Sequence, residues 1–148
     1  MTALRQLPEF AKAAWYSDPT DHRCPHDAWL EAIEISEPAE GERKEKRKTA
    51  IAVRLLNAYH DGYIILRYAG VRGFSIGSSS AGRGLDDWLE DRFSLTSAAL
   101  FRHEITWCFG PDAKSLWFIE SESVSYEWIP KMGDPVGTDN SGAAPRRV

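Results

Sequence analysis

The chain has 148 residues, of which 43% are hydrophobic and 27% are charged. This length allows one globular domain with a sizeable core that needs no disulfide bonds. Eighteen basic residues against twenty-two acidic ones give a formal net charge of −4 at pH 7, which disfavours nucleic-acid phosphates and suits basic protein partners better.

The first predicted element is a short amphipathic helix over residues 7–16, where apolar side chains recur at helical spacing. Turn-forming residues fill 17–27. A strand is then expected over 28–36, with Trp29 and Ile33 on the same side.

Residues 37–48, EPAEGERKEKRK, are almost wholly charged, with the acids mainly first and the bases mainly last. Such a segment between two strands predicts a long, solvated hairpin loop. Basic clusters can bind acids, but a charge run is usually a solvent-exposed face.

The strongest hairpin signal is Asp61-Gly62, which lies between two runs rich in Ile, Val, Leu and Tyr. A type I′ turn with these two residues as the loop would place Leu56 opposite Arg67. Side-chain alternation then predicts a core face made of Ile51, Val53, Leu55, Asn57, Tyr59, Ile64, Leu66 and Tyr68.

A third strand is expected over 71–76, followed by a flexible segment over 77–84. Residues 85–93 predict a second short helix, because their apolar side chains fall on one side. The rest of that helix would be the most acidic surface of the protein, formed by Asp86, Asp87, Glu90 and Asp91.

A second hairpin is predicted from strands over 100–110 and 114–121, with Phe109 opposite Lys114. This register puts His103 opposite Glu120, and it predicts a core face of Phe101, Ile105, Trp107, Phe109, Leu116 and Phe118. A final strand ends at Pro130, which closes a single domain over 1–130. Residues 131–148 have almost no large apolar side chains and predict a disordered tail.

These elements predict an α+β fold with a mainly antiparallel sheet of about six or seven strands, rolled or sandwich-like, and two short helices. Two cysteines do not make a secreted disulfide framework. The first residues lack the pattern of a signal peptide, and no apolar run approaches the roughly 20 residues that span a bilayer. We therefore expect a cytoplasmic protein with no membrane segment.

His22, Cys24 and His26 have H-x-C-x-H spacing and are of types that zinc accepts. Structural zinc sites usually combine two separated ligand pairs, and the sequence has no second pair. We therefore expect neither a metal nor another cofactor, and we keep these residues only as a weak candidate.

A hydrolase-like enzyme is the least favoured function. His60 beside Asp61 invites an acid/base interpretation, yet turn chemistry already explains Asp61. His103 with Glu104 or Glu120 predicts a cross-strand ion pair more readily than catalysis. Nucleotide-binding glycine motifs and the common hydrolase motifs are absent from the sequence.

The second face of the first hairpin mixes aliphatic residues with arginines that cannot be buried unpaired. It could form a stacking or anion-binding surface, although such arginines more often pair with local carboxylates. The residues of this candidate surface are Arg54, Arg67, Tyr63 and His60.

Three segments carry a resemblance: HDAWLEAIEI, LLNAYHDGYIILRYAGV over 55–71, and VSYEWIP before the tail. Together they resemble small bacterial β-rich proteins that are similar in style to the immunity proteins of polymorphic toxin systems. The resemblance covers about Pro25 to Pro130 by layout of short strands. It implies a binding protein, and it transfers no toxin-contacting residue.

The leading hypothesis is therefore a non-enzymatic protein-binding module, and an immunity-type inhibitor of a bacterial toxin is one form that it could take. It would bind a basic surface through Asp86, Asp87, Glu90 and Asp91. The partner would be another protein, not a nucleic acid or a membrane, and the oligomeric state stays open. The alternative is a small-ligand-binding β scaffold whose cleft is lined by Trp29, Tyr63, Trp117 and Trp128.

Overall fold

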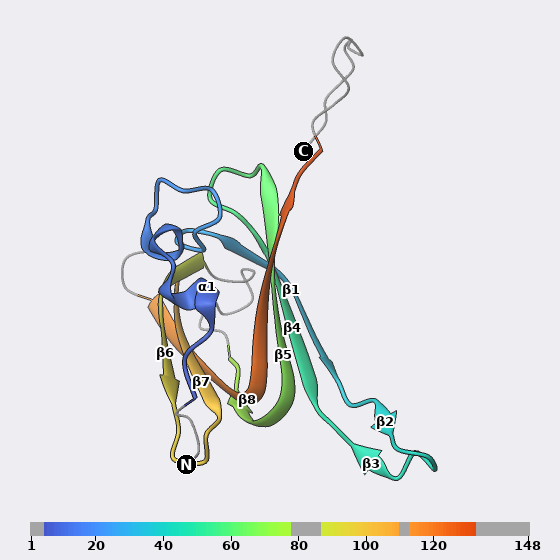
Figure 1. Cartoon of the computed structure of the whole chain (residues 1–148). Helices are drawn as coiled ribbons and strands as arrows, with labels where there is room; N and C mark the ends of the chain where they lie inside the picture. Colours follow the sequence, from blue (N-terminus) through green and yellow to red (C-terminus); the bar gives the residue numbers. More distant parts are fainter. Residues whose placement is uncertain (1–4, 78–86, 110–112, 133–148) are drawn as a thin grey trace.

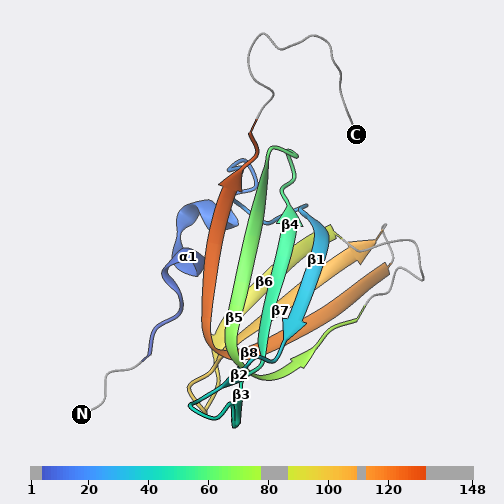
Figure 2. The same cartoon turned by 90° about the vertical axis from the view of Figure 1, so that its right-hand side faces the viewer.

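The computed structural model describes residues 5–77, 87–109 and 113–132. Six antiparallel strands close into a barrel in the order β1-β4-β5-β8-β7-β6 (Figures 1 and 2). The prediction of a mainly antiparallel sheet is confirmed. The barrel strands are β1 (Trp29–Ser36), β4 (Ala50–Leu56), β5 (Gly62–Ser75), β6 (Asp87–Leu95), β7 (Phe101–Phe109) and β8 (Ala113–Pro130).

The helical content is smaller than predicted. In place of the helix over 7–16 there are a four-residue α1 (Glu9–Lys12) and a short 3₁₀ helix, η1 (Ala14–Ser17). The predicted helix over 85–93 is wrong, because its described part belongs to β6, which pairs with β7. A register shift between Trp88 and Glu90 lets a strand turn both Trp88 and Phe93 inward.

The turn of the first hairpin differs from the predicted two-residue loop. Residues 57–61 connect β4 to β5, Leu56 pairs with Tyr63, and Arg67 pairs with Ala52. The buried Asn57 side chain organises this turn: its Oδ1 accepts from the backbone N–H groups of Asp61 and Gly62, at 2.9 and 3.1 Å, and its Nδ2 donates to Asp61 and to the His22 carbonyl.

The register of this hairpin moves by four residues relative to the prediction, since Leu56 faces position 63 in place of 67. An even shift leaves each side chain on its predicted face. The predicted core face is accordingly buried, with the exception of Tyr59, which lies in the turn and is 47% exposed.

The second hairpin has Phe109 opposite Ala113, one residue from the predicted register. A shift by one residue exchanges the two faces of a strand. Trp117 and Ile119 are therefore buried, whereas Leu116 is 62% exposed and Phe118 is half-buried, so the predicted core positions of the last two are wrong. The side chain of Phe109 lies outside the described part of the chain.

The predicted strand over 71–76 is the continuation of β5, which bends where Gly70 has a φ of +64° and the pairing with β8 shifts between Val71 and Gly73. β8 is also long and pairs with β5 along most of its length and with β7 along its first half. It ends at Pro130, as predicted.

A register shift also divides β1. Leu30 pairs with Leu55 and Ile33 pairs with Val53, with the irregularity between them. Leu30 is consequently buried, and Trp29, predicted to share a side with Ile33, turns outward and is 48% exposed.

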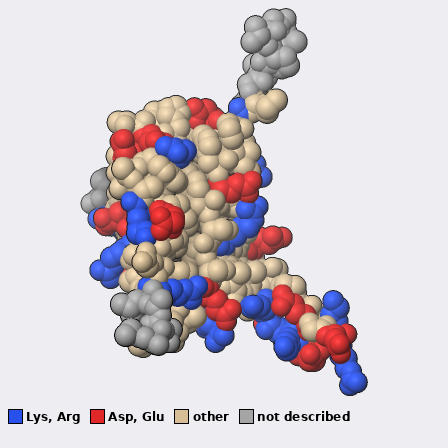
Figure 3. All heavy atoms as spheres, in the orientation of Figure 1, with Lys and Arg blue, Asp and Glu red and all other residues tan. Residues whose placement is uncertain are grey.

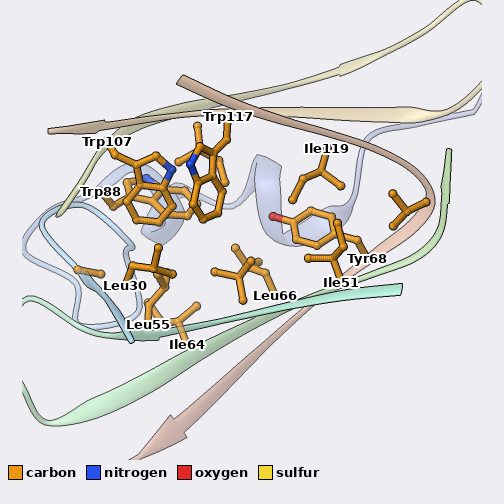
Figure 4. Packing of buried hydrophobic residues seen from close by; sticks show 14 residues of the cluster. Leu30, Ile51, Leu55, Ile64, Leu66, Tyr68, Trp88, Trp107, Trp117 and Ile119 are labelled. Atoms are coloured by element: carbon orange, nitrogen blue, oxygen red, sulfur yellow. The ribbon is translucent and has the colours of Figure 1, made fainter. Parts of the chain in front are cut away.

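Side chains fill the inside of the barrel (Figure 4). Trp88, Trp107 and Trp117 lie together at one end, and Tyr68, Ile51 and Ile119 lie toward the other. The ring centroids of Trp107 are 5.4 Å from Trp88 and 4.7 Å from Trp117. Burial of these large rings contributes to the hydrophobic stabilisation of the core.

The N-terminal segment covers the barrel between β6 and β8 (Figure 1). The Phe10 ring lies 5.5 Å from that of Phe93 on β6 and 5.4 Å from that of Tyr126 on β8. Arg5 holds the start of this segment by donating to the Ala99 carbonyl, at 2.8 Å, and to the Glu122 carbonyl.

The charged segment over 37–48 forms a small hairpin of its own, β2 (Ala39–Glu40) with β3 (Lys46–Arg47), which projects from the barrel (Figure 1). Residues 37–48 are all exposed. In the part of the chain that the structure describes, no helix is both long and apolar enough to cross a bilayer.

Candidate functional site

A chain of hydrogen bonds joins four side chains from four separate elements beneath the N-terminal segment. The Tyr68 hydroxyl of β5 lies 2.7 Å from Nδ1 of His103 on β7, whose Nε2 lies 2.6 Å from Oδ2 of Asp91 on β6. The Tyr16 hydroxyl of η1 donates to the same carboxylate oxygen at 2.8 Å. These contacts cross-link the strands of the barrel and the N-terminal segment.

Burial decides where the protons lie. His103 is fully buried, and desolvation lowers its pKa more than the Asp91 carboxylate raises it. A neutral ring donates from Nε2–H to Asp91 and accepts at Nδ1 from the Tyr68 hydroxyl, which satisfies both nitrogens. Desolvation first, then the charge of Asp91, raises the pKa of Tyr16 and Tyr68, so both remain donors.

The surrounding rings fix the imidazole in place. The Phe93 ring stacks on His103 with centroids 3.7 Å apart and an interplanar angle of 8°. Trp88 lies on another side at 5.7 Å. The register shift after Trp88 is what aims Asp91 inward, because Asp91 pairs with Ile105, which is a core residue.

A cavity of about 280 Å³ adjoins this chain of side chains; we call it the Asp91 cavity. β6 forms one wall and residues from η1 and the following loop form the other. The Asp91 side chain is 13% exposed, and its second oxygen, Oδ1, accepts no hydrogen bond from any residue in the described ranges. The lining residues include Tyr16, Pro19, Cys24, Pro25, His26, Trp88, Leu89, Glu90, Asp91, Arg92 and Phe93.

The acidic residues predicted to share a helix face are divided by the strand. Asp91 points inward and contacts His103 and Tyr16, whereas Glu90 is exposed. Asp87 is half-buried where β6 pairs with β1. Asp86 lies outside the described residues. Of the three described residues in this set, Glu90 and Asp91 line the cavity.

The residues of the H-x-C-x-H pattern each have a separate partner. Nδ1 of His22 lies 2.6 Å from Asp61, and Nδ1 of His26 lies 3.3 Å from Asp27. The buried Cys24 thiol donates to the Tyr16 carbonyl at 3.0 Å, and desolvation raises its pKa, so it is a weak nucleophile. Across the residues with described positions, no three potential ligands come together to hold a metal.

His60 and Asp61, the first histidine-based catalytic candidate, do not come together as an acid/base pair. Asp61 is held by Asn57, whose hydrogen bond lowers its pKa, and by His22. His60 instead lies against the ring of Trp29, with centroids 4.3 Å apart.

The predicted ion pair of His103 with Glu104 or Glu120 is wrong. Both carboxylates pair with Arg102, and Glu104 also pairs with Arg92. His103 faces Ile119 across the strand pair, inside the barrel.

The candidate anion surface on the outer face of β4 and β5 has its arginines paired with local carboxylates. The Arg54 guanidinium lies 4.3 Å from the Tyr63 ring centre and 3.3 Å from Glu31, and Arg67 pairs with Glu127 at 2.6 Å. His60 is exposed at the adjacent turn.

The four aromatic residues of the small-ligand alternative do not line one cleft. Trp117 is buried in the core, Trp29 is exposed on the outer face, and the half-buried Tyr63 carries the guanidinium of Arg54. Trp128 packs against the core cluster from its edge.

Comparison with known protein families, with curated proteins and with solved structures finds no significant match. One sequence signal did point to the buried network: His103 is in phase with Phe101, Ile105 and Trp107, and a histidine among core positions requires polar partners.

Proposed function

We propose that this chain is a protein-binding module that acts by recognition, and that the Asp91 cavity receives a basic side chain of the partner. The proposal is supported by Asp91, which lines the cavity and whose Oδ1 atom accepts no hydrogen bond from a described residue. A Lys or Arg side chain of the partner would pair with this oxygen.

The hydrogen-bond chain supports recognition over catalysis. Tyr16 and Tyr68 remain protonated and His103 remains neutral, and each already has its donor or acceptor occupied. An acid/base catalyst needs a titratable group that can reach substrate. Here the network instead holds Asp91 in one orientation, which lowers the entropic cost of binding.

The resemblance of three segments to immunity proteins makes a bacterial toxin the partner class to test first, in the cytoplasm. The net charge of −4 favours association with a basic surface. An inhibitor of this kind would occlude the toxin by placing one of its Lys or Arg side chains beside Asp91.

The test is capture of the partner by the tagged wild-type chain and by an Asp91→Asn variant, with thermal melts to verify folding. We expect a stoichiometric partner whose affinity falls by about tenfold or more with Asp91→Asn, since a buried charge pair loses one member. Glu90→Gln, at the rim, should weaken binding less. Glu34→Gln removes an exposed charge from β1 and is the control.

Equal capture by the folded Asp91→Asn variant would refute this site. The alternative of a small-ligand scaffold is supported by the size of the cavity, about 280 Å³, which is near the lower end of ligand pockets, roughly 300 Å³. A thermal shift caused by a small alkylamine in wild type, absent in Asp91→Asn and without any captured protein, would favour that alternative.

A further inference from the structure

A second cavity is lined by residues that belong to none of the candidate sites described above. Its volume is about 540 Å³, and it opens where the β2–β3 hairpin leaves the barrel and β5 bends away from β4. We call it the fork cavity. Its lining residues are Glu40, Lys46, Arg47, Lys48, Thr49, Gly70, Val71, Arg72 and Glu122.

The bend of β5 creates this space. Val71 donates its backbone N–H to the Thr49 carbonyl at 2.9 Å, after Gly70 has taken a φ of +64°. Beyond this point β5 pairs with β8 and no longer with β4, and Arg72 lines the cavity together with residues of the hairpin. Bulges of this kind commonly redirect a side chain at the end of a strand pairing.

The charges around the fork cavity are unequal, with four basic side chains and two acidic ones. Arg72 and Lys48 both pair with Glu122, at 2.5 and 3.5 Å, while Arg47 pairs with Glu37. Lys46 makes no ion pair with a described residue. Figure 3 shows charged side chains of both signs gathered along this hairpin and at its base.

Glu122 behaves as an anion built into the cavity. The hydrogen bond from Arg72, followed by the charge of Lys48, lowers the pKa of Glu122. The Arg5 guanidinium donates to the Glu122 carbonyl and adds a further positive charge nearby. The local field therefore already stabilises one negative charge, while Lys46 has no ion-pair partner among the described residues.

We propose that the fork cavity binds a compact, multiply charged phosphate compound through Lys46, Lys48 and Arg72. The ion pairs in the cavity are exposed, and such pairs contribute little, so the cations can turn to a ligand at small cost. A phosphate chain offers the oxygens that Lys and Arg bind best.

The lining also narrows the ligand class. Its described residues include no aromatic side chain on which a nucleobase could stack, and such stacking is a main source of affinity for single-stranded nucleic acids. The ligand should therefore be held by its phosphates alone. This site lies outside the Asp91 cavity, so its occupancy is independent of the function proposed above.

The test is calorimetric titration of the full chain with inorganic triphosphate, at low and high salt. We expect binding that is tighter than that of inorganic phosphate and that weakens with salt. Lys48→Gln with Arg72→Gln should reduce the affinity by about tenfold or more, because two close charges are lost. Arg43→Gln with Lys44→Gln removes two charges from the same hairpin outside the lining, and it should have a much smaller effect.

Glu122→Gln distinguishes a binding site from a structural charge cluster. Removal of the built-in carboxylate should tighten triphosphate binding by about threefold or more, through loss of one like charge at short range. Weaker binding by this variant while it remains folded, equal losses in the two double variants, or no binding by wild type would each overturn the proposal. Binding of single-stranded RNA without binding of triphosphate would overturn it as well.

Discussion

The six-membered ring of Trp128 lies in the space that a Cβ atom on Gly62 would occupy. The two residues belong to β8 and β5, and Trp128 pairs with Ile64, two residues along the strand. Gly62 does not have a positive φ, in contrast to Gly41 and Gly70. Glycine is thus required at position 62 by the close approach of an indole ring, and the conformation of the turn makes no such demand.

Gly62→Ala should destabilise the protein by about 1–3 kcal/mol, the usual cost of overpacking. Gly73→Ala in the same strand is the matched control, because a Cβ there would lie 3.6 Å from its nearest neighbour, an ordinary contact. That change should be neutral or slightly stabilising. Urea unfolding of both variants measures the difference, and equal stabilities would contradict the packing role of Trp128.

Asn57→Ala should cost about 2–4 kcal/mol, because its side chain makes four hydrogen bonds in a fully buried position and several partners would be left unsatisfied. Tyr59→Phe is the comparison within the same turn. It removes one exposed hydrogen bond, to the Pro19 carbonyl, and should cost less than about 1 kcal/mol. If denaturant unfolding gave similar losses, Asn57 would not organise the turn.

Two buried tryptophans differ in the state of their indole N–H. Nε1 of Trp117 donates to the Gly77 carbonyl at 2.6 Å, whereas Nε1 of Trp107 is buried without a hydrogen-bond partner among the described residues. Replacement by Phe removes a similar volume at each. Trp117→Phe should therefore destabilise the protein by about 1 kcal/mol more than Trp107→Phe, in melts compared at one pH, and the reverse order would refute this assignment.

The stability of the protein should fall as the pH drops through the range in which free histidine titrates. Burial lowers the pKa of His103, so below about pH 6.5 the unfolded chain binds a proton that the folded chain does not. The free energy of unfolding should then rise with pH by up to about 1.4 kcal/mol per pH unit. Urea unfolding between pH 5.5 and 7.5 measures this slope.

His103→Gln should lose most of that pH dependence, at the cost of some stability at all pH values. His60→Gln, at an exposed position, should retain it. A wild-type slope that survives in His103→Gln would assign the effect to other groups.

The faces of β4 and β5 could be predicted from sequence because alternation is a local property of each strand. Their register could not, since it depends on how residues 57–61 fold. The glycine at position 62 indicated a tight turn, although its physical role is the contact with Trp128. The predicted register was wrong by four residues, and the predicted core face was still correct because an even shift keeps each side chain on its face.

β6 shows a different limit. In the sequence, Leu85, Trp88, Leu89 and Phe93 have the spacing of a helix face, yet Trp88 and Phe93 also turn inward from an irregular strand, and pairing with β7 decides between the two. A single sequence holds no record of that distant partner. For the same reason the site could not be predicted: Tyr16, Tyr68, Asp91 and His103 come from elements that only the closed barrel brings together.

The position of β8 has a consequence for biosynthesis. This strand pairs with β5 on one side and with β7 on the other, so the barrel closes only when residues 113–130 join strands that precede them in the chain. Contacts between residues far apart along the chain slow folding, because the chain loses the entropy of closing the loop before these contacts can stabilise it. The nascent chain should consequently stay open on the ribosome until residues 113–130 emerge, and chaperones would meet it with its tryptophans uncovered.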